Sequence, residues 1–383
     1  MSSVVIEALK ALKALNTQGT QHAGHSTRGT QHGALKALNT QRGYWHRAST
    51  GYWHGFCDGL SMYTFDEPQI KHHVRYIDPS CVYHVMSKTW GGLYLMAPKD
   101  GVREIITGIV AQSKMKYPEI KLYYDVFLSN HFHLMMQGPG CQFSPFVGSI
   151  KREISVRIGN QNGIPGPFWN SRFTSTALPT ENSTIECLDY LLSQGSKEDL
   201  VERPQDWPGA QGAKQLMYGE KRKGVWFDGT AYAIAKNKAS NLKNPPPIKR
   251  KDFYQKRELN LDVLPAWKDT PETERQSFVQ SRVEKITHKE KTRRQQEGKR
   301  ILGVKRVKAQ SIFKGKTPPS PPFWKDRKRV ITAWADLRHW VTQEYTRRYW
   351  EFQTLYRVAA EAFKEGFTEP EFPPGAWRPT CYS

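Results

Sequence analysis

Two histidines stand two residues apart in a stretch of sequence with the character of a buried β-strand. The stretch 129–138 reads SNHFHLMMQG and places His131 and His133 on either side of Phe132. Side chains alternate along a strand, so both imidazoles point to one face and lie about 7 Å apart. Two imidazoles at that spacing can share one metal ion, although histidines in this pattern are also common as surface residues or as hydrogen-bonded core residues.

A tyrosine and an amide stand one helical turn apart further along the chain. Tyr190 and Gln194 are spaced i, i+4 in a segment whose apolar stripe is formed by Ile185, Leu188 and Leu192. At about 100° per residue, Tyr190 lies nearly opposite that stripe. We therefore expect it to face a cleft or solvent rather than the main core; a solvent-facing tyrosine is the simpler reading of this residue taken alone.

Taken together, these side chains have the composition of a site for phosphodiester chemistry. A free tyrosine hydroxyl has a pKa of about 10, so it becomes an effective nucleophile only with help from a base or a metal ion. A divalent ion held by two imidazoles and an amide would polarise a phosphate oxygen and leave positions open for substrate and water. These ligand types suit Mn²⁺ or Zn²⁺ at least as well as Mg²⁺, so the sequence does not fix the metal.

The overall charge favours an anionic partner. The 383 residues carry a formal net charge of +21, and the pI is about 9.7. Nucleic acid is the first expectation, and an acidic membrane surface is the rival. No run approaches about 18 apolar residues, and the N-terminus has no signal-peptide apolar core. The five cysteines include no CxxC pair. We expect a soluble protein of the cytoplasm, associated with the nucleoid, with no membrane as partner.

The elements that must position these residues follow from the pattern of apolar residues. Strands are expected at 82–88, 120–128, 131–137 and 168–178. Helices are expected at 99–116, from Ser144–Pro145 to about 158, and from a capping box at Ser183–Glu186 to about Gln194, with Gly195 as its stop. This order predicts an α+β fold, a split βαβ (ferredoxin-like) arrangement with an antiparallel-rich sheet and helices on one side.

The chain from about 75 to 212 resembles the single-tyrosine transposases of the HUH endonuclease superfamily, in particular the REP-associated and insertion-sequence types. The motifs that carry the resemblance are YHVMSK (83–88), NHFHLMM (130–136), FWNSRF (168–173), LDYLLSQG (188–195) and LVERPQDWP (200–208). It departs from the REP-associated pattern at Gln194–Gly195, where those members usually carry Asn-Pro, and at Ser129, where a proline is common.

The resemblance implies an activity and a role for each residue. His131, His133 and Gln194 would hold a divalent metal, Mg²⁺ or Mn²⁺, and Tyr190 would be the nucleophile. The enzyme would cut and rejoin single-stranded or hairpin DNA through a covalent 5′-phosphotyrosine. His84, on the first strand, is not counted as a ligand.

Several basic and aromatic residues are candidates for DNA contact. Lys88, Lys151, Arg152, Arg157 and Arg172 would hold phosphates, and Trp169 would stack on a base. The plainer interpretation is a solvated charged surface and a tryptophan packed at the edge of the core.

Outside this region the sequence suggests four parts. Residues 1–61 repeat short units such as ALKALNTQ and are expected to be disordered, with the functional chain beginning near Met62. The domain proper spans 74–212. Residues 213–323 read as a basic, Pro-containing linker with helical segments, and 324–383 as an amphipathic helical C-terminal extension that packs on the core, packs on another copy or grips DNA.

Other functions remain open at this point. The main alternative is a domesticated protein that binds DNA or RNA hairpins without cutting them; a histidine-based nucleotide hydrolase is more distant, because its run of alternating histidines is absent. Relatives act as dimers or as monomers, so a homodimer also stays open.

Overall fold

The computed structural model describes residues 74–164, 166–244, 246–313, 339–367 and 369–376, all within the second of two compact units of the chain, 69–383. The predicted repeat segment 1–61 and the predicted start of the C-terminal helix at 324–338 lie outside the described residues. Within the described part, no helix is both long enough and apolar enough to cross a membrane.

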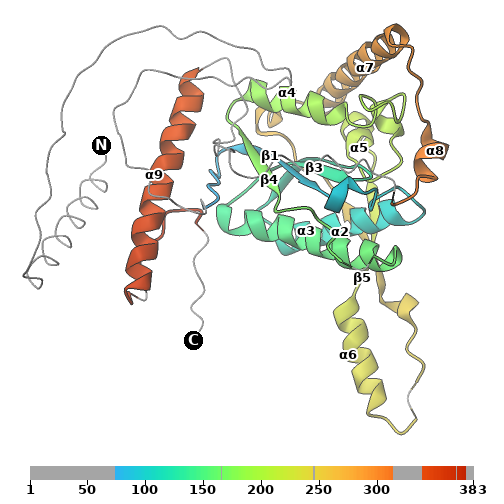
Figure 1. Cartoon of the computed structure of the whole chain (residues 1–383), viewed down its shortest axis with the longest axis vertical. Coiled ribbons are helices and arrows are strands. Elements are labelled where there is room, and N and C mark those ends of the chain that lie inside the picture. The colour runs from blue at the N-terminus through green and yellow to red at the C-terminus, as the bar shows by residue number, and fades with distance from the viewer. Residues whose placement is uncertain (1–73, 165, 245, 314–338, 368, 377–383) are drawn as a thin grey trace, which may run out of the picture. The chain divides into compact units, whose positions relative to one another are not determined.

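A four-stranded antiparallel sheet lies at the centre of the domain (Figure 1). Its strands are β1 (Val82–Lys88), β2 (Lys121–Phe127), β3 (His131–Gln137) and β4 (Thr174–Leu178), arranged in the order β2-β3-β1-β4. One helix connects β1 to β2 and another connects β3 to β4. This confirms the predicted α+β fold with a split βαβ order. The fourth strand begins six residues later than predicted, because 168–173 forms turns and a single bridge from Trp169 to Thr89.

Helices α2 (Val102–Lys116) and α3 (Gly140–Gln161) cover one face of the sheet. They bury the alternate strand residues, including Val85, Phe132 and Leu134. The predicted start of α3 at Ser144–Pro145 is wrong. The helix begins at Gly140 and holds Pro145 inside it, because fully buried Phe143 extends the apolar stripe back by one turn.

The opposite face of the sheet is covered as well. Helices α4 (Glu181–Leu192), α5 (Ala213–Tyr218) and α7 (Glu272–Gln296) contribute to a second core with strand residues Val126 and Met135. The expectation of helices on one side therefore holds for α2 and α3 only. Six consecutive residues of β2 are buried, so this strand has no face suited to water and needs cover on both sides.

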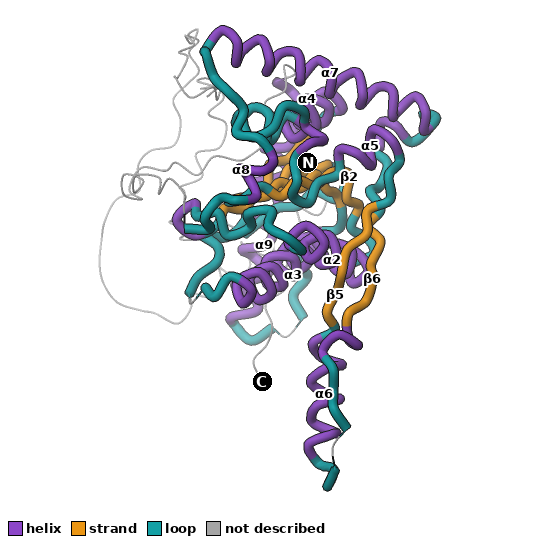
Figure 2. The backbone as a smooth tube through the Cα atoms, turned by 90° about the vertical axis from the view of Figure 1, so that its right-hand side faces the viewer, coloured by secondary structure: helices purple, strands orange, loops and turns teal. Residues whose placement is uncertain are grey.

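Part of the range predicted as a linker folds onto this domain. Strands β5 (Arg222–Phe227) and β6 (Tyr254–Leu259) form an antiparallel hairpin that packs on α2. Arg222 makes a buried ion pair with Asp125 of β2, through hydrogen bonds of 2.5 and 2.8 Å. Between the two strands the chain forms α6 (Gly229–Ser240), which runs away from the sheet (Figure 2).

The described residues after α7 include the helices α8 (Val304–Lys308) and α9 (His339–Lys364). The α9 helix packs on the segment that leads into β1. The Tyr345 hydroxyl lies 3.3 Å from that of Tyr83, and Gln353 donates to the Val74 carbonyl at 2.7 Å. Of the roles expected for the C-terminal extension, the described part of α9 fits an accessory helix that packs on the core.

Candidate functional site

The strand register brings the two predicted histidines to the face of the sheet that α4 covers. His131 pairs with Lys88 and His133 with Met86 of the neighbouring strand β1. Phe132 between them is buried among the side chains of α2 and α3, so the imidazoles point the other way. Their ring centroids are 4.9 Å apart.

Helix α4 carries the predicted nucleophile across this face. The helix begins two residues before the predicted Ser183, because Thr180 is its cap and Ser183 closes the capping box. Leu188 and Leu191 pack into the second core, and Tyr190 lies half-buried at the margin of that core. The Tyr190 ring centroid is 5.8 Å from that of His133. The tyrosine therefore faces the histidines rather than open solvent.

Gln194 connects the tyrosine to the histidines. It lies just beyond the end of α4, is 2% exposed and donates to the Tyr190 carbonyl at 3.0 Å. Its side chain also lies close enough to His131 and Tyr190 to act on their pKa values, raising that of His131 and lowering that of Tyr190, although burial outweighs both effects. Gly195 turns the chain immediately afterwards with a φ of +86°, a value that glycine adopts freely. The four residues predicted from the sequence are thus in one place.

The histidines are held in their neutral form. Burial, together with the positive charges of Lys88 and Lys197, lowers the pKa of His131 to about 4. Burial also lowers the pKa of His84 to about 4 and that of His133 well below its usual value. Neutral imidazoles at pH 7 keep a lone pair for a metal ion, while the two lysines make the surroundings attractive to a phosphate.

One buried nitrogen atom indicates that the two histidines and Gln194 suit a divalent metal ion. Nε2 of His133 is buried and has no hydrogen-bond partner, whereas its Nδ1 lies 2.8 Å from Nε2 of His84. A buried nitrogen without a partner is costly unless something binds it. Among the described residues, no three His, Cys, Asp or Glu side chains form a group that could hold a metal. The candidate donor set therefore consists of two imidazoles and the Gln194 amide.

Sequence reasoning missed a lysine and a glutamate that follow Gln194. The Lys197 ammonium lies 3.7 Å from the centroid of the Tyr190 ring. Glu198 accepts a hydrogen bond from the Gly195 backbone at 2.5 Å, and its Oε1 lies 3.6 Å from the Lys197 Nζ. Burial raises the pKa of Glu198. The available signal was the glycine turn after the helix, which folds the next residues back onto the helix end.

The long helix α7 supports both α4 and this turn. Arg282 forms an ion pair with Asp189, the residue before Tyr190, with Nε to Oδ1 at 2.8 Å. Further along α7, Arg293 pairs with Asp199, and Arg294 donates to the Ser196 carbonyl at 3.3 Å. These contacts join segments more than 90 residues apart in the chain, so local patterns could not reveal them.

The predicted DNA-contacting residues do not gather around the histidines, except for Lys88. Lys151 donates to the Ser171 carbonyl at 2.7 Å, and the Trp169 indole donates to the Lys151 carbonyl at 2.9 Å. Burial lowers the pKa of Lys151 to about 8. Trp169 is half-buried and packs edge-on against Phe132, on the face away from the histidines.

The three predicted arginines have different surroundings. Arg157 pairs with Glu153 at 2.9 Å and lies 3.9 Å over the Trp226 ring, so it holds the β5–β6 hairpin against α3. Arg152 also contacts Glu153 but is exposed. Arg172 is exposed in the segment before β4. Their contact with DNA stays a prediction.

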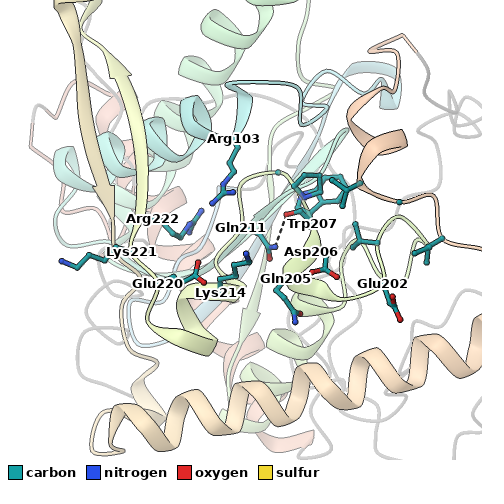
Figure 3. A pocket seen from close by; sticks show the side chains of 16 residues that line it. Arg103, Glu202, Gln205, Asp206, Trp207, Gln211, Lys214, Glu220, Lys221 and Arg222 are labelled. Atoms are coloured by element: carbon teal, nitrogen blue, oxygen red, sulfur yellow. Dashed lines mark hydrogen bonds between the residues drawn. The ribbon is translucent and has the colours of Figure 1, made fainter.

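A cavity of about 450 Å³ lies elsewhere on the domain (Figure 3). Its lining includes Arg103 of α2, Lys214 of α5, Gln205 and Trp207. None of the predicted metal ligands or the tyrosine lines it. Its lining mixes positive and negative side chains, among them Lys214, Glu220 and Arg222.

The chain has been compared with known proteins. No protein-family model and no curated protein matches it. One similar solved structure is a REP-associated tyrosine transposase bound to a REP hairpin, with 18% identity over 38% of this chain and 84% of that chain, at a TM-score of 0.33. Another is a putative transposase from Deinococcus radiodurans R1, with 17% identity over 30% of this chain and 89% of that one, at a TM-score of 0.23. Both TM-scores are below 0.5, so neither similarity supports an argument about the function of this chain.

Proposed function

We propose that the chain is a metal-dependent transposase that cleaves and rejoins single-stranded or hairpin DNA, with Tyr190 as its nucleophile. The observation that carries this proposal is that Tyr190 lies beside the candidate metal ligands: its ring centroid is 5.8 Å from that of His133, and buried Gln194 donates to the Tyr190 carbonyl at 3.0 Å. This closeness supports an arrangement in which the attacking oxygen and a phosphate-polarising ion act on the same phosphate.

In this proposal His131, His133 and Gln194 hold the ion. A bound divalent ion would supply Lewis-acid polarisation of a phosphate oxygen. Burial raises the pKa of Tyr190, so the phenol is protonated at neutral pH and must lose its proton during attack. The Lys197 ammonium lies 3.7 Å from the ring centroid, whereas the charge of nearby Glu198 adds to the rise in the pKa of Tyr190.

The covalent step is a transesterification. The Tyr190 oxygen bonds to phosphorus and loses its proton, the bond from phosphorus to the 3′ oxygen breaks, and the leaving oxygen takes up a proton. The product is a 5′-phosphotyrosine and a free 3′ hydroxyl. Attack by a 3′ hydroxyl on the same phosphorus reverses the step and rejoins a strand, so bond energy is conserved without a nucleotide cofactor.

A covalent-trapping assay tests the proposal. DNA hairpins with single-stranded flanks, labelled at the 3′ end so that the adduct keeps the label, are incubated with protein and Mn²⁺ and run on a denaturing gel. Wild type should give a labelled protein band. Tyr190→Phe should abolish it, and His131→Ala or a chelator should reduce it at least about 100-fold.

The matched control is Tyr218→Phe, which alters an exposed tyrosine away from the site and should leave the band unchanged. If wild type binds the hairpins but gives no band across a broad library, the cleavage proposal is wrong and the chain is a hairpin-binding protein.

A further inference from the structure

The segment 228–253 between β5 and β6 is a basic projection, which we call the finger. It consists of α6 and the return segment that leads into β6, and it contains two acidic residues, Asp228 and Asp252. Its basic residues are all exposed: Lys236, Lys238, Lys243, Lys249, Arg250 and Lys251. Asp228 is used to cap α6, where it accepts a hydrogen bond from the Ala231 backbone at 2.9 Å.

The finger lysines are unneutralised. Within the described residues, none of the five forms an ion pair or a hydrogen bond through its side chain. Elsewhere in the domain, by contrast, Arg222, Arg282 and Arg293 pair with carboxylates. A concentration of uncompensated positive charge is unfavourable for the isolated molecule and becomes favourable on contact with an anionic surface.

The finger has a firm attachment to the domain. At its root, the Phe227 ring packs against Tyr232 and Tyr254. Its centroid lies 5.6 Å from the Tyr232 centroid and 5.1 Å from the Tyr254 centroid. Arg157 of α3 donates to the Phe227 carbonyl at 2.9 Å. Lys236 and Lys238 are therefore presented on a supported helix, which reduces the entropy lost on binding.

The chemistry of the finger fits the phosphate backbone of duplex DNA. Proteins that grip single strands stack bases on exposed aromatic rings, whereas the aromatic rings of the finger, Tyr232 and Phe253, are half-buried and pack on each other with centroids 5.4 Å apart. Helix α6 is about 18 Å long, and a duplex presents a phosphate charge every 1.7 Å or so along its axis. Lysines on a helix and its return segment could therefore meet several phosphates of one stem.

The finger also lies apart from the candidate cleavage site. The hairpin that carries it packs on α2 and is contacted by Arg157 of α3, whereas the histidines and Tyr190 lie on the α4 face of the sheet. The finger would therefore contribute to holding DNA without touching the reacting groups.

We propose that the finger is a second DNA-binding surface, which grips the duplex stem of the hairpin through its phosphates. The inference rests on the proposed function for its choice of DNA as the partner. Backbone contacts of this kind add affinity and salt dependence but no base specificity.

The test compares two triple variants of the full chain with the same charge change. One is Lys236→Gln, Lys238→Gln and Lys243→Gln in the finger. The control is Lys99→Gln, Lys121→Gln and Lys268→Gln, which removes three exposed lysines outside the finger. Binding of a fluorescent DNA hairpin is measured by anisotropy at several salt concentrations in chelator, so that no cleavage intervenes.

The finger variant should bind at least about tenfold more weakly at 0.1 M salt, and its plot of log K against log salt should be shallower by up to about 3. Unchanged melting temperature in both variants shows that the fold is intact. An unchanged slope in the finger variant would overturn the inference, and so would an equal loss in the control.

Two further experiments identify the partner of the finger and separate this proposal from the proposed function. Finger-dependent binding to phosphatidylserine vesicles, with DNA binding unaffected, would make the partner a membrane and overturn the inference. The covalent-trapping assay at saturating DNA reports on the proposed function separately. A finger variant that binds weakly but gives a normal adduct at saturation supports both proposals, and finger-dependent binding without any adduct supports only this one.

Discussion

At the scale of single residues, His84 stands out as the residue that orients a predicted ligand. Its Nε2 lies 2.8 Å from Nδ1 of His133, and the two rings stack with centroids 5.0 Å apart. If Nδ1 of His133 donates this hydrogen bond, the lone pair of its buried Nε2 is free for a metal ion. His84 would then act as a positioning residue, the part that a carboxylate or carbonyl commonly plays behind a metal-bound histidine.

Replacement of His84 should therefore weaken metal binding. We expect His84→Ala to lower Mn²⁺ affinity by about 10- to 100-fold, measured by calorimetry without DNA. His84→Asn, whose amide can accept the same hydrogen bond, should recover part of the affinity. Equal Mn²⁺ affinity in wild type and His84→Ala, with equal melting temperatures in chelator, would show that His84 does not orient His133.

The site residues differ in how far the sequence could reveal them. His131, His133, Tyr190 and Gln194 lie in two short motifs whose strand and helix periodicities already place each pair on one face. Lys197 and the His84–His133 hydrogen bond depend on how the chain turns after Gly195 and on the diagonal contact between β1 and β3. Neither is a property of any short stretch of sequence.

At the scale of secondary-structure elements, α7 acts as a support for the helix that carries the tyrosine. Arg282 fixes Asp189 one residue before Tyr190, and both partners of this ion pair are partly exposed. The pair links α7 to the residue next to the predicted nucleophile, so its loss should disturb the orientation of Tyr190 more than the stability of the fold.

The Arg282→Gln variant tests this support. We expect a loss of stability of less than about 1 kcal/mol and unchanged DNA affinity, together with a roughly tenfold slower formation of the covalent adduct at saturating DNA. Arg275→Gln, on the same helix but bonded to the Trp267 carbonyl, is the matched control. Equal adduct rates in the two variants would contradict a positioning role for Arg282.

The elements themselves were predictable where the apolar pattern is regular. Strands β1 and β3 have the predicted bounds, because each is short, alternating and ended by polar residues. The start of α3 was misplaced because Ser144–Pro145 has the residues of a helix start, whereas the helix holds Pro145 in its second turn at the cost of one backbone hydrogen bond. The β5–β6 hairpin was read as linker because basic residues and prolines separate its two strands, which pair across more than 25 intervening residues.

At the scale of the whole molecule, the buried histidines make stability depend on pH. The pKa of His84 and of His131 is about 4 in the folded protein, below the value of about 6.5 for an unfolded chain. Between these values the unfolded state binds more protons, so the stabilisation from the neutral histidines is complete above pH 6.5 and is lost as the pH falls towards 4.

This dependence can be measured by denaturant unfolding in chelator, at intervals from pH 7.5 to pH 4.5. In the wild type, the free energy of unfolding should decrease as the pH is lowered. The double variant His84→Gln, His131→Gln should show a flatter profile over the same range, whatever its stability at pH 7.5. Parallel profiles would show that these two groups do not control the acid sensitivity.

The close approach of Gly108 in α2 to Gly224 in β5 bears on where the domain can be divided. A Cβ added at Gly224 would lie 2.1 Å from the Gly108 nitrogen, so helix and strand meet backbone to backbone with no room between them. Leu259 of β6 is fully buried in the same core as the sheet. Helix α7 adds Val279 and Val283 to the second core, so the piece of this protein that can be transplanted, recombined or inherited as a module extends past β6 to include α7, well beyond the last motif at 208. A gene fusion cut at 212 would separate the motifs from part of the core on which they depend.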